Sequence, residues 1–164
     1  MAYPTAHRAH LPAGYGLPPD SPRLDWAEVD ARLRDAPHYW IGTVGTDGVP
    51  TVRPIDGMWL DGALFFGSDP ASRWRRNLAV NPRAAVHLED AERAVIVEGD
   101  VTAIRLQYHL AARLAEAANV KYGLGQSVRD YEGQESCMLR PRVVFAWTTL
   151  YRDATRFTFG RPPG

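Results

Sequence analysis

Apolar and polar residues alternate along several short runs in the middle and at the end of the chain. These runs are rich in β-branched and aromatic residues, as strands are. Asp47-Gly48 and Asp61-Gly62 separate three of them, and Asp-Gly tolerates the positive φ of a tight hairpin turn. The pattern therefore predicts antiparallel hairpins. The expected strands cover residues 38–44, 49–60, 63–67, 83–89, 93–103, 143–149 and 155–159.

Three other segments carry apolar residues at the three- and four-residue spacing of a helix. The expected helices cover residues 24–35, 68–80 and about 104–121. In the second, Pro70 is expected at the first helical position, with Ser68 or Asp69 as the cap. Too few helices remain for a fold in which a helix follows each strand. The pattern thus favours a mainly β (α+β) class, a small antiparallel barrel with helical insertions.

The N-terminal segment has a different composition. Residues 1–23 contain five prolines and little periodicity, which indicates an extended arm without a core of its own. Its apolar residues, such as Leu11 and Leu17, favour an arm that lies on a surface. Residues 24–164 are then expected to form one domain, a size that suits a single core.

Charge and cysteine content narrow the class of function. The net charge of zero gives no general affinity for nucleic acid or for an anionic membrane. No apolar run approaches the roughly 20 residues of a membrane span. Cys137 is the single cysteine, so no disulfide forms within the chain, and a cytoplasmic setting is expected. Lys121 is the only lysine among 19 basic residues, so an anion site must use arginine, backbone amides or hydroxyls.

Several kinds of catalytic site are not expected. The histidines are scattered and the lone cysteine has no histidine beside it, so we expect no metal centre and no thiol nucleophile. The sequence also lacks the glycine-rich nucleotide loops and the G-x-S-x-G motif. A bound organic cofactor would need none of these.

The helix expected at 68–80 combines groups that suit a phosphate. At 100° per residue, one side carries Arg73, Arg76 and Asn77, and Ser68 and Ser72 add hydroxyls near the start. Guanidinium donors at the positive end of a helix dipole favour an anion. A basic face that is merely solvated remains the alternative.

The stretch T51-V-R-P-I-D-G57 is unusual for a strand. With period two, Thr51, Arg53 and Ile55 point one way while Val52 and Pro54 point the other. Proline has no amide hydrogen, so we expect the ladder to break or bulge at Pro54. A planar, polar-edged ligand such as a flavin would satisfy the freed backbone groups, with Arg53 reaching an oxygen or a phosphate. A plain edge strand is the alternative.

The order of these features resembles the flavin-binding split-barrel family related to pyridoxamine 5′-phosphate oxidase. Within that family, the actinobacterial-type flavin/deazaflavin-dependent reductases look most similar. The matching pieces are residues 43–55, 65–83, 139–147 and 154–157, spread over roughly 38–159. The resemblance implies a six- to seven-stranded antiparallel split β-barrel with helical insertions.

The resemblance also implies a homodimer with two cofactor sites at the subunit interface. The cofactor would be FMN or the 8-hydroxy-5-deazaflavin coenzyme, with Arg53, Pro54 and Ile55 along its ring system. The residues that would face its phosphate-bearing tail are Ser72, Arg73, Arg76 and Asn77. Trp147 would lie near the cofactor or the dimer seam, with a plain core position as the alternative.

One position departs from the family pattern. Many relatives have lysine directly after the Ser-Arg pair, where this chain has Trp74. The resemblance therefore leaves FMN, the deazaflavin and a haem or other tetrapyrrole open. The expected function is hydride transfer from a bound flavin or deazaflavin to a small conjugated acceptor such as a quinone or an enone. A non-catalytic carrier or sensor is the alternative, and no residue is assigned as proton donor.

Overall fold

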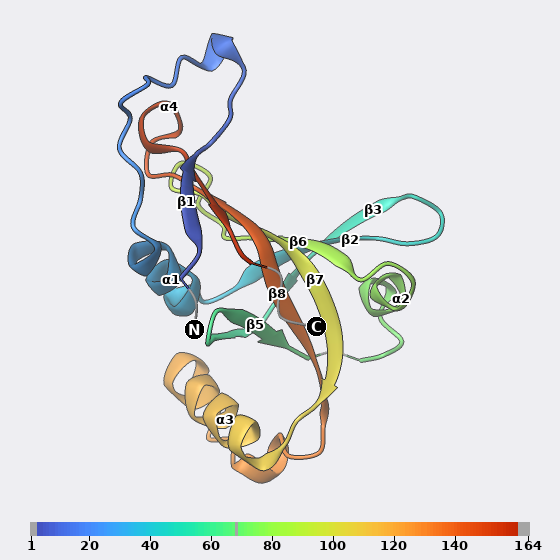
Figure 1. Cartoon of the computed structure of the whole chain (residues 1–164). Helices are drawn as coiled ribbons and strands as arrows, with labels where there is room; N and C mark the ends of the chain where they lie inside the picture. Colours follow the sequence, from blue (N-terminus) through green and yellow to red (C-terminus); the bar gives the residue numbers. More distant parts are fainter. Residues whose placement is uncertain (1–2, 68, 161–164) are drawn as a thin grey trace.

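Nine strands form one antiparallel sheet that curls into a split barrel (Figure 1). The computed structural model describes residues 3–67 and 69–160. The strands are β1 (Thr5–Arg8), β2 (Tyr39–Val44), β3 (Pro50–Ile55), β4 (Met58–Leu60), β5 (Ala63–Phe66), β6 (Arg83–His87), β7 (Val95–Arg105), β8 (Glu135–Ala146) and β9 (Thr155–Thr158). The helices are α1 (Trp26–Asp35), α2 (Arg73–Val80), α3 (Tyr108–Tyr122) and α4 (Leu150–Asp153), with short 3-10 turns at Ala13–Tyr15 and Val128–Asp130. The mainly β class is confirmed.

The long strand β8 holds the two halves of the barrel together. Along one edge it pairs with β7 over its length. Along the other edge, its first part pairs with β5 and its last part with β9. The remaining strands run outward as β1 beyond β9, β4 beyond β5, and β6, β2 and β3 beyond β7. The sheet therefore divides at β8, and β3 ends it on the side of α2.

The two faces of the sheet differ in burial. Alternate residues of β2, β6 and β7 are buried on the inner face, as their sequence pattern predicts. Val29 and Leu33 of α1 pack into this core with Tyr39 and Ile41 of β2. The opposite face, called the open face below, carries half-buried or exposed residues. They include Trp40, Gly42, Val52, Pro54, Ala85, His87, Ile96, Glu98, Val143 and Phe145.

Three strand predictions need correction. The run 49–60 is two strands, because the chain turns at Asp56-Gly57 and the buried Gly57 lies close to the Phe65 carbonyl. Strand β8 begins at Glu135, not at residue 143. The N-terminal arm adds β1, whose residues pair with β9. These additions raise the strand count above the six or seven expected.

The three expected helices form, but two begin several residues later than expected. Helix α3 begins at Tyr108, because Ile104 and Arg105 still belong to β7. Helix α3 ends at Gly123, whose φ of 66° suits a left-handed cap. Helix α2 begins at Arg73 with Ser72 at the N-cap position, so Pro70 lies in the preceding turn, not at the first helical position. The proposed cap Ser68 lies outside the described residues. None of the helices in residues 3–67 and 69–160 is long and apolar enough to cross a membrane.

A β-bulge interrupts the central β7–β8 pair. Glu98 pairs with Val143 and Gly99 with Pro141, which leaves Arg142 as the extra residue. A side chain at Gly99 would run into the Arg140 backbone, with only 2.9 Å between its Cβ and the Arg140 carbonyl carbon. The absence of a side chain at this position therefore lets the two strands approach closely at the bend.

We predict that Gly99→Ala lowers the free energy of unfolding by about 2 kcal/mol or more, because the backbone of β8 must move to admit a methyl group. Urea denaturation measures the change. Gly14→Ala is the matched control, since no atom lies within 4 Å of its added Cβ. Equal stability of the two variants would contradict this account of the bulge.

Candidate functional site

Helix α2 is fixed to the β2–β3 hairpin through Asn77. The Asn77 side chain is buried, and its Nδ2 donates to Thr43 Oγ1 at 3.1 Å and to Thr51 Oγ1 at 3.2 Å. The two hydroxyls also lie 3.1 Å from each other. Asn77 was expected on the basic, ligand-facing side of the helix. The structure instead turns it inward, because the two threonine hydroxyls complete its hydrogen bonds there.

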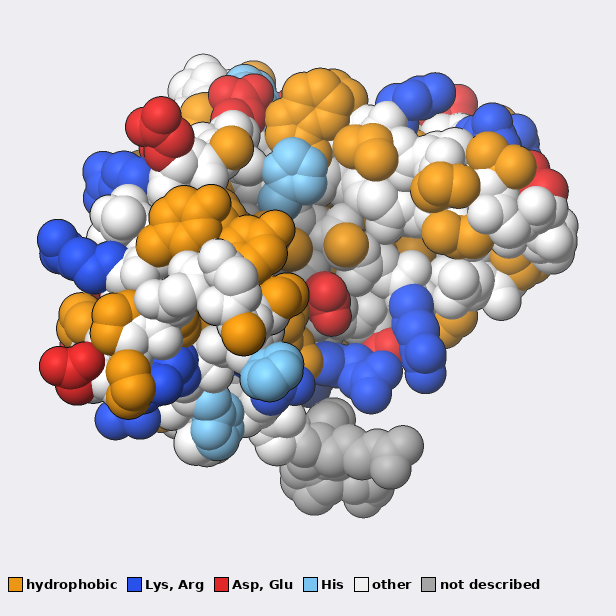
Figure 2. Space-filling model, turned by 90° about the horizontal axis from the view of Figure 1, so that it is seen from above, with side chains coloured by type: hydrophobic (Ala, Val, Ile, Leu, Met, Phe, Trp, Pro, Cys, Tyr) orange, Lys and Arg blue, Asp and Glu red, His pale blue; other side chains and the backbone are white. Residues whose placement is uncertain are grey.

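Arg73 and Arg76 lie on the outer side of α2. Arg73 is exposed and donates to Asp47 Oδ2 at 3.1 Å, which joins the start of the helix to the hairpin turn. Arg76 is also exposed and donates to the Ala71 carbonyl. Ser72 occupies the N-cap position beside them. In Figure 2, Lys and Arg side chains border exposed apolar ones at the end of the molecule where the hairpin projects.

Arg75 points away from Arg73 and Arg76. It donates to Glu135 and, at 2.6 Å, to Cys137 Sγ. Burial raises the pKa of the Cys137 thiol more than the Arg75 charge lowers it. The thiol is therefore held neutral and packed, as expected for a residue without a catalytic role.

The Arg-Pro segment forms the edge of the sheet without breaking it. The β2–β3 ladder is continuous, and Pro54 lies opposite Trp40. The expected break is therefore wrong, since a proline fits an edge strand when its nitrogen faces outward. Arg53 Nη1 donates to the carbonyl of Val52 at 2.8 Å, as expected if alternate carbonyls point away from β2. This outer edge has no partner strand among the described residues.

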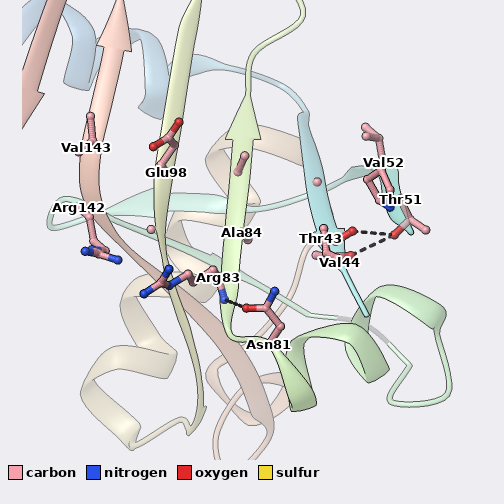
Figure 3. Close-up of a pocket in the computed structure, with 14 residues that line it drawn as sticks. Thr43, Val44, Thr51, Val52, Asn81, Arg83, Ala84, Glu98, Arg142 and Val143 are labelled. Carbon is pink, nitrogen blue, oxygen red and sulfur yellow. Dashed lines mark hydrogen bonds between the residues drawn. The ribbon is translucent and has the colours of Figure 1, made fainter. Parts of the chain in front are cut away.

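A groove of about 550 Å³ crosses the open face beside this edge (Figure 3). Its walls come from β3, β2, β6, β7 and β8, with Asn81 closing the end near α2. The volume lies in the range of small-molecule sites. In Figure 3 the side chains of Arg83 and Arg142 extend into the groove, with Glu98 above them. Arg142 reaches it as the extra residue of the β7–β8 bulge.

The structure brings some of the expected site residues together. Arg53, Pro54 and Ile55 follow one another on β3, and Ile55 is buried. Thr51 lies on the same face as Arg53 and is the residue that Asn77 contacts, so α2 adjoins this part of β3. The expected residues of the α2 end that accompany them are Ser72, Arg73, Arg76 and Asn77.

Trp147 lies elsewhere in the subunit. Its amide donates to the Ala94 carbonyl at 3.1 Å and its Nε1 to the Ala91 carbonyl at 3.3 Å. These residues adjoin the His87 end of β6, whereas α2 leads into the Arg83 end. Within one chain, Trp147 and the α2 arginines are therefore at opposite ends of the sheet.

One acid–base pair was missed from the sequence. His38 Nδ1 lies 2.9 Å from Asp56 Oδ1, and both side chains are exposed. The pair stands one step beyond the Tyr39–Ile55 pair of the β2–β3 ladder, where the His38 ring also stacks on Tyr122. The sequence contained one signal for this pair, the hairpin turn at Asp47-Gly48. When the β2–β3 pairing is extended from that turn, residue 38 lies opposite residue 56.

The site offers donors for an organic anion and no metal centre. Among residues 3–67 and 69–160, no three histidine, cysteine or acidic side chains group as metal ligands. The open edge of β3 presents backbone groups to a planar ring, and the arginines present charge to a phosphate. The residues present therefore fit a flavin-like group.

Comparison with solved structures supports the fold. A conserved hypothetical protein from Mycobacterium tuberculosis has a TM-score of 0.66 at 18% identity, over 78% of this chain and 87% of its own. An F420 reductase has a TM-score of 0.51 at 21% identity, over 68% and 92%. The haem storage protein HutZ of Vibrio cholerae has a TM-score of 0.59 at 17% identity, over 76% and 94%. At these identities the likeness concerns the fold alone.

The sequence itself decides the family. No curated protein matches the chain. The family model of pyridoxamine 5′-phosphate oxidase matches residues 26–155, which include the barrel from β2 to β8 together with α2 and α3. The chain therefore belongs to the pyridoxamine 5′-phosphate oxidase family.

Proposed function

We propose that this protein is an oxidoreductase that binds a flavin or deazaflavin and reduces a small conjugated acceptor such as a quinone or an enone. The observation that carries the proposal is the outer edge of β3, which has no partner among the described strands and lies beside the exposed arginines of α2. A polar ring edge and a phosphate are the two recognition elements of such a cofactor. The fold similarity to an F420 reductase, F420 being a deazaflavin coenzyme, also supports it.

Each cofactor contact has a candidate residue. The segment Arg53-Pro54-Ile55 would lie along the ring system. Because the backbone groups of Arg53 and Ile55 pair with β2, the outward-facing groups of Val52 and Pro54 would meet the polar edge of the ring, and the Arg53 guanidinium would leave the Val52 carbonyl to reach a ring oxygen. Arg73 and Arg76 would bind the phosphate. Trp74, where many relatives have lysine, is buried against Phe66 and takes no part in binding. When bound, the cofactor supplies the hydride chemistry.

We also propose a homodimer, with the open face as the interface. This face exposes Val52 and half-buries Trp40 and Phe145, and Trp40 stacks on His87 with an interplanar angle of 7°. A second copy would cover these apolar groups and close the groove beside β3. It would also allow Trp147 of one copy to approach the cofactor of the other.

The His38–Asp56 pair is placed to supply the proton that accompanies hydride transfer. Asp56 fixes Nδ1, and stacking on Tyr122 fixes the ring plane. Nε2 is then the nitrogen that exchanges protons with a bound acceptor, a role that histidine fills near neutral pH. The pair follows directly after Ile55, at the end of the proposed ring site.

A haem carrier is the second candidate, favoured by the likeness of the fold to the haem storage protein HutZ. His87 is an exposed imidazole on the open face and is the residue that would hold the haem. A Soret band on haem titration that His87→Ala abolishes would favour this function. Tight FMN or deazaflavin binding with no such band would exclude it.

We predict that the purified protein binds FMN or the deazaflavin with a Kd well below 1 mM, and that Arg73→Ala/Arg76→Ala raises this Kd at least tenfold. The loss of two charge-assisted hydrogen bonds accounts for a change of about this size or more. Visible absorption titrations of both cofactors measure it, with the melting temperature as a check on folding.

The matched control is Arg129→Ala/Arg152→Ala, which removes the same charge from exposed arginines outside α2. This control should keep the Kd of the unchanged protein. A Kd of about 1 mM or weaker for both cofactors in the unchanged protein would refute the proposed function. An unaltered Kd in the α2 variant would mean that Arg73 and Arg76 are solvent-exposed charges without a role in cofactor binding.

We predict that His38→Gln slows turnover of the loaded enzyme about a hundredfold while cofactor affinity stays unchanged, since the substitution removes only the proton-exchanging group. Turnover with a quinone panel and the absorption titration separate the two effects. His109→Gln, an exposed histidine on α3, should leave both unaltered. Full activity of the His38 variant would remove the pair from the mechanism.

A further inference from the structure

A second groove, of about 670 Å³, lies between α1 and α3 on the other side of the molecule from α2. The strand β4 forms its floor, with one edge paired to β5 and the other edge unpaired among the described strands. Its apolar lining consists of Pro37, Met58, Trp59, Leu60, Ala117 and Val120. The groove is separate from the proposed cofactor site and is large enough for a small organic molecule.

The only lysine of the chain lies at one end of this groove. Lys121 Nζ donates to Tyr39 Oη at 3.0 Å and to the Gly57 carbonyl at 3.1 Å. The Tyr39 hydroxyl in turn donates to the Leu33 carbonyl, so it acts only as an acceptor toward the amine. The rings of Tyr39 and Tyr122 lie 4.9 and 5.7 Å from Nζ. Two hydrogen bonds and two rings thus hold the amine in one place.

Burial makes the Lys121 amine easier to deprotonate than that of an ordinary lysine. Burial lowers the pKa of the amine to about 8, although the charges of Asp35 and Asp56 oppose the shift. The two nearest arginines of the groove are already paired, Arg34 with Asp30 and Arg113 with Asp61. The ionisable groups around the amine are Tyr39, Tyr122, His38, Asp35, Asp56, Arg34, Arg113 and Glu116.

We propose that Lys121 is a reactive amine that captures small aldehydes with an apolar body as reversible imines in this groove. In the neutral amine, the two N–H bonds are directed to Tyr39 and Gly57, which leaves the nitrogen lone pair for the ligand. The apolar lining receives the body of the aldehyde. Such an aldehyde carries no charge and needs no charged partner in the groove. Arg34 and Arg113 are accordingly paired with acidic residues of the protein itself.

The chemistry needs no further reactant. The Nζ lone pair forms a bond to the carbonyl carbon, the two N–H protons of the amine pass to the carbonyl oxygen, and the oxygen leaves as water. The carbon–nitrogen double bond of the imine replaces the lost carbon–oxygen bond, and hydrolysis reverses the step. This capture uses another groove and no cofactor, although Lys121 adjoins the His38–Asp56 pair through Tyr122 and Gly57.

The test is reductive labelling with benzaldehyde and cyanoborohydride, mapped by peptide mass spectrometry. The variant Leu124→Lys provides an internal reference, because position 124 is 58% exposed, lies outside the groove and adds an ordinary amine near Lys121. At pH 7.5 we expect Lys121 to be labelled about tenfold faster or more than the introduced amine, since an ordinary lysine has a pKa near 10.4. The Lys121 rate should rise with pH through about 8 and then level off.

Blocking the groove provides the second measurement. Ala117→Trp fills it, so labelling of Lys121 should fall at least tenfold while a circular dichroism spectrum confirms folding. Equal labelling of the two amines in the Leu124→Lys variant would overturn the proposal, as would a Lys121 rate that keeps rising to pH 10. Cofactor titration of the same samples reports separately on the proposed function.

Discussion

The pairing of β7 with β8 is the constraint on which the rest of the structure depends. These two strands run side by side from Val95–Ala146 to Arg105–Glu135, and every other part of the sheet is attached to one of them. The bulge at Glu98/Gly99 bends the pair, and bending is what allows a single sheet to curl into a barrel. The same bulge turns Arg142 into the groove on the open face, so one irregularity shapes both fold and site.

The two grooves differ in what surrounds them. The first lies on the open face beside the edge of β3, which has no partner among the described strands, and Arg83 and Arg142 line it. The second lies between α1 and α3, where apolar side chains surround an amine of lowered pKa. The helices α1 and α3 cover the β4 side of the barrel, whereas none of the described helices covers the open face. That asymmetry is one reason for proposing the open face as the dimer interface.

Local chemistry made much of the fold predictable. Asp-Gly turns and alternating apolar residues identified the hairpins, and glycine ended α3 where expected. Strand β8 was only half found, because Arg140, Pro141 and Arg142 interrupt its apolar pattern at the bulge. The start of α2 was misplaced since Pro70 suits a turn as well as a first helical position. The start of β8 and the start of α2 both depend on contacts with other parts of the fold, which a local pattern does not show.

The sequence by itself determined the mainly β class, the positions of the hairpins and the strand that carries Arg53, Pro54 and Ile55. These features follow from turn chemistry and from the alternation of buried and exposed residues along a strand. Only the tertiary structure decided that Asn77 faces two threonines, that His38 meets Asp56 and that Lys121 lies under Tyr39. These contacts join residues that are 18 to 82 positions apart in the sequence. A local sequence pattern does not show which distant polar groups will meet. Their hydrogen bonds form only when the folded chain brings the two groups together.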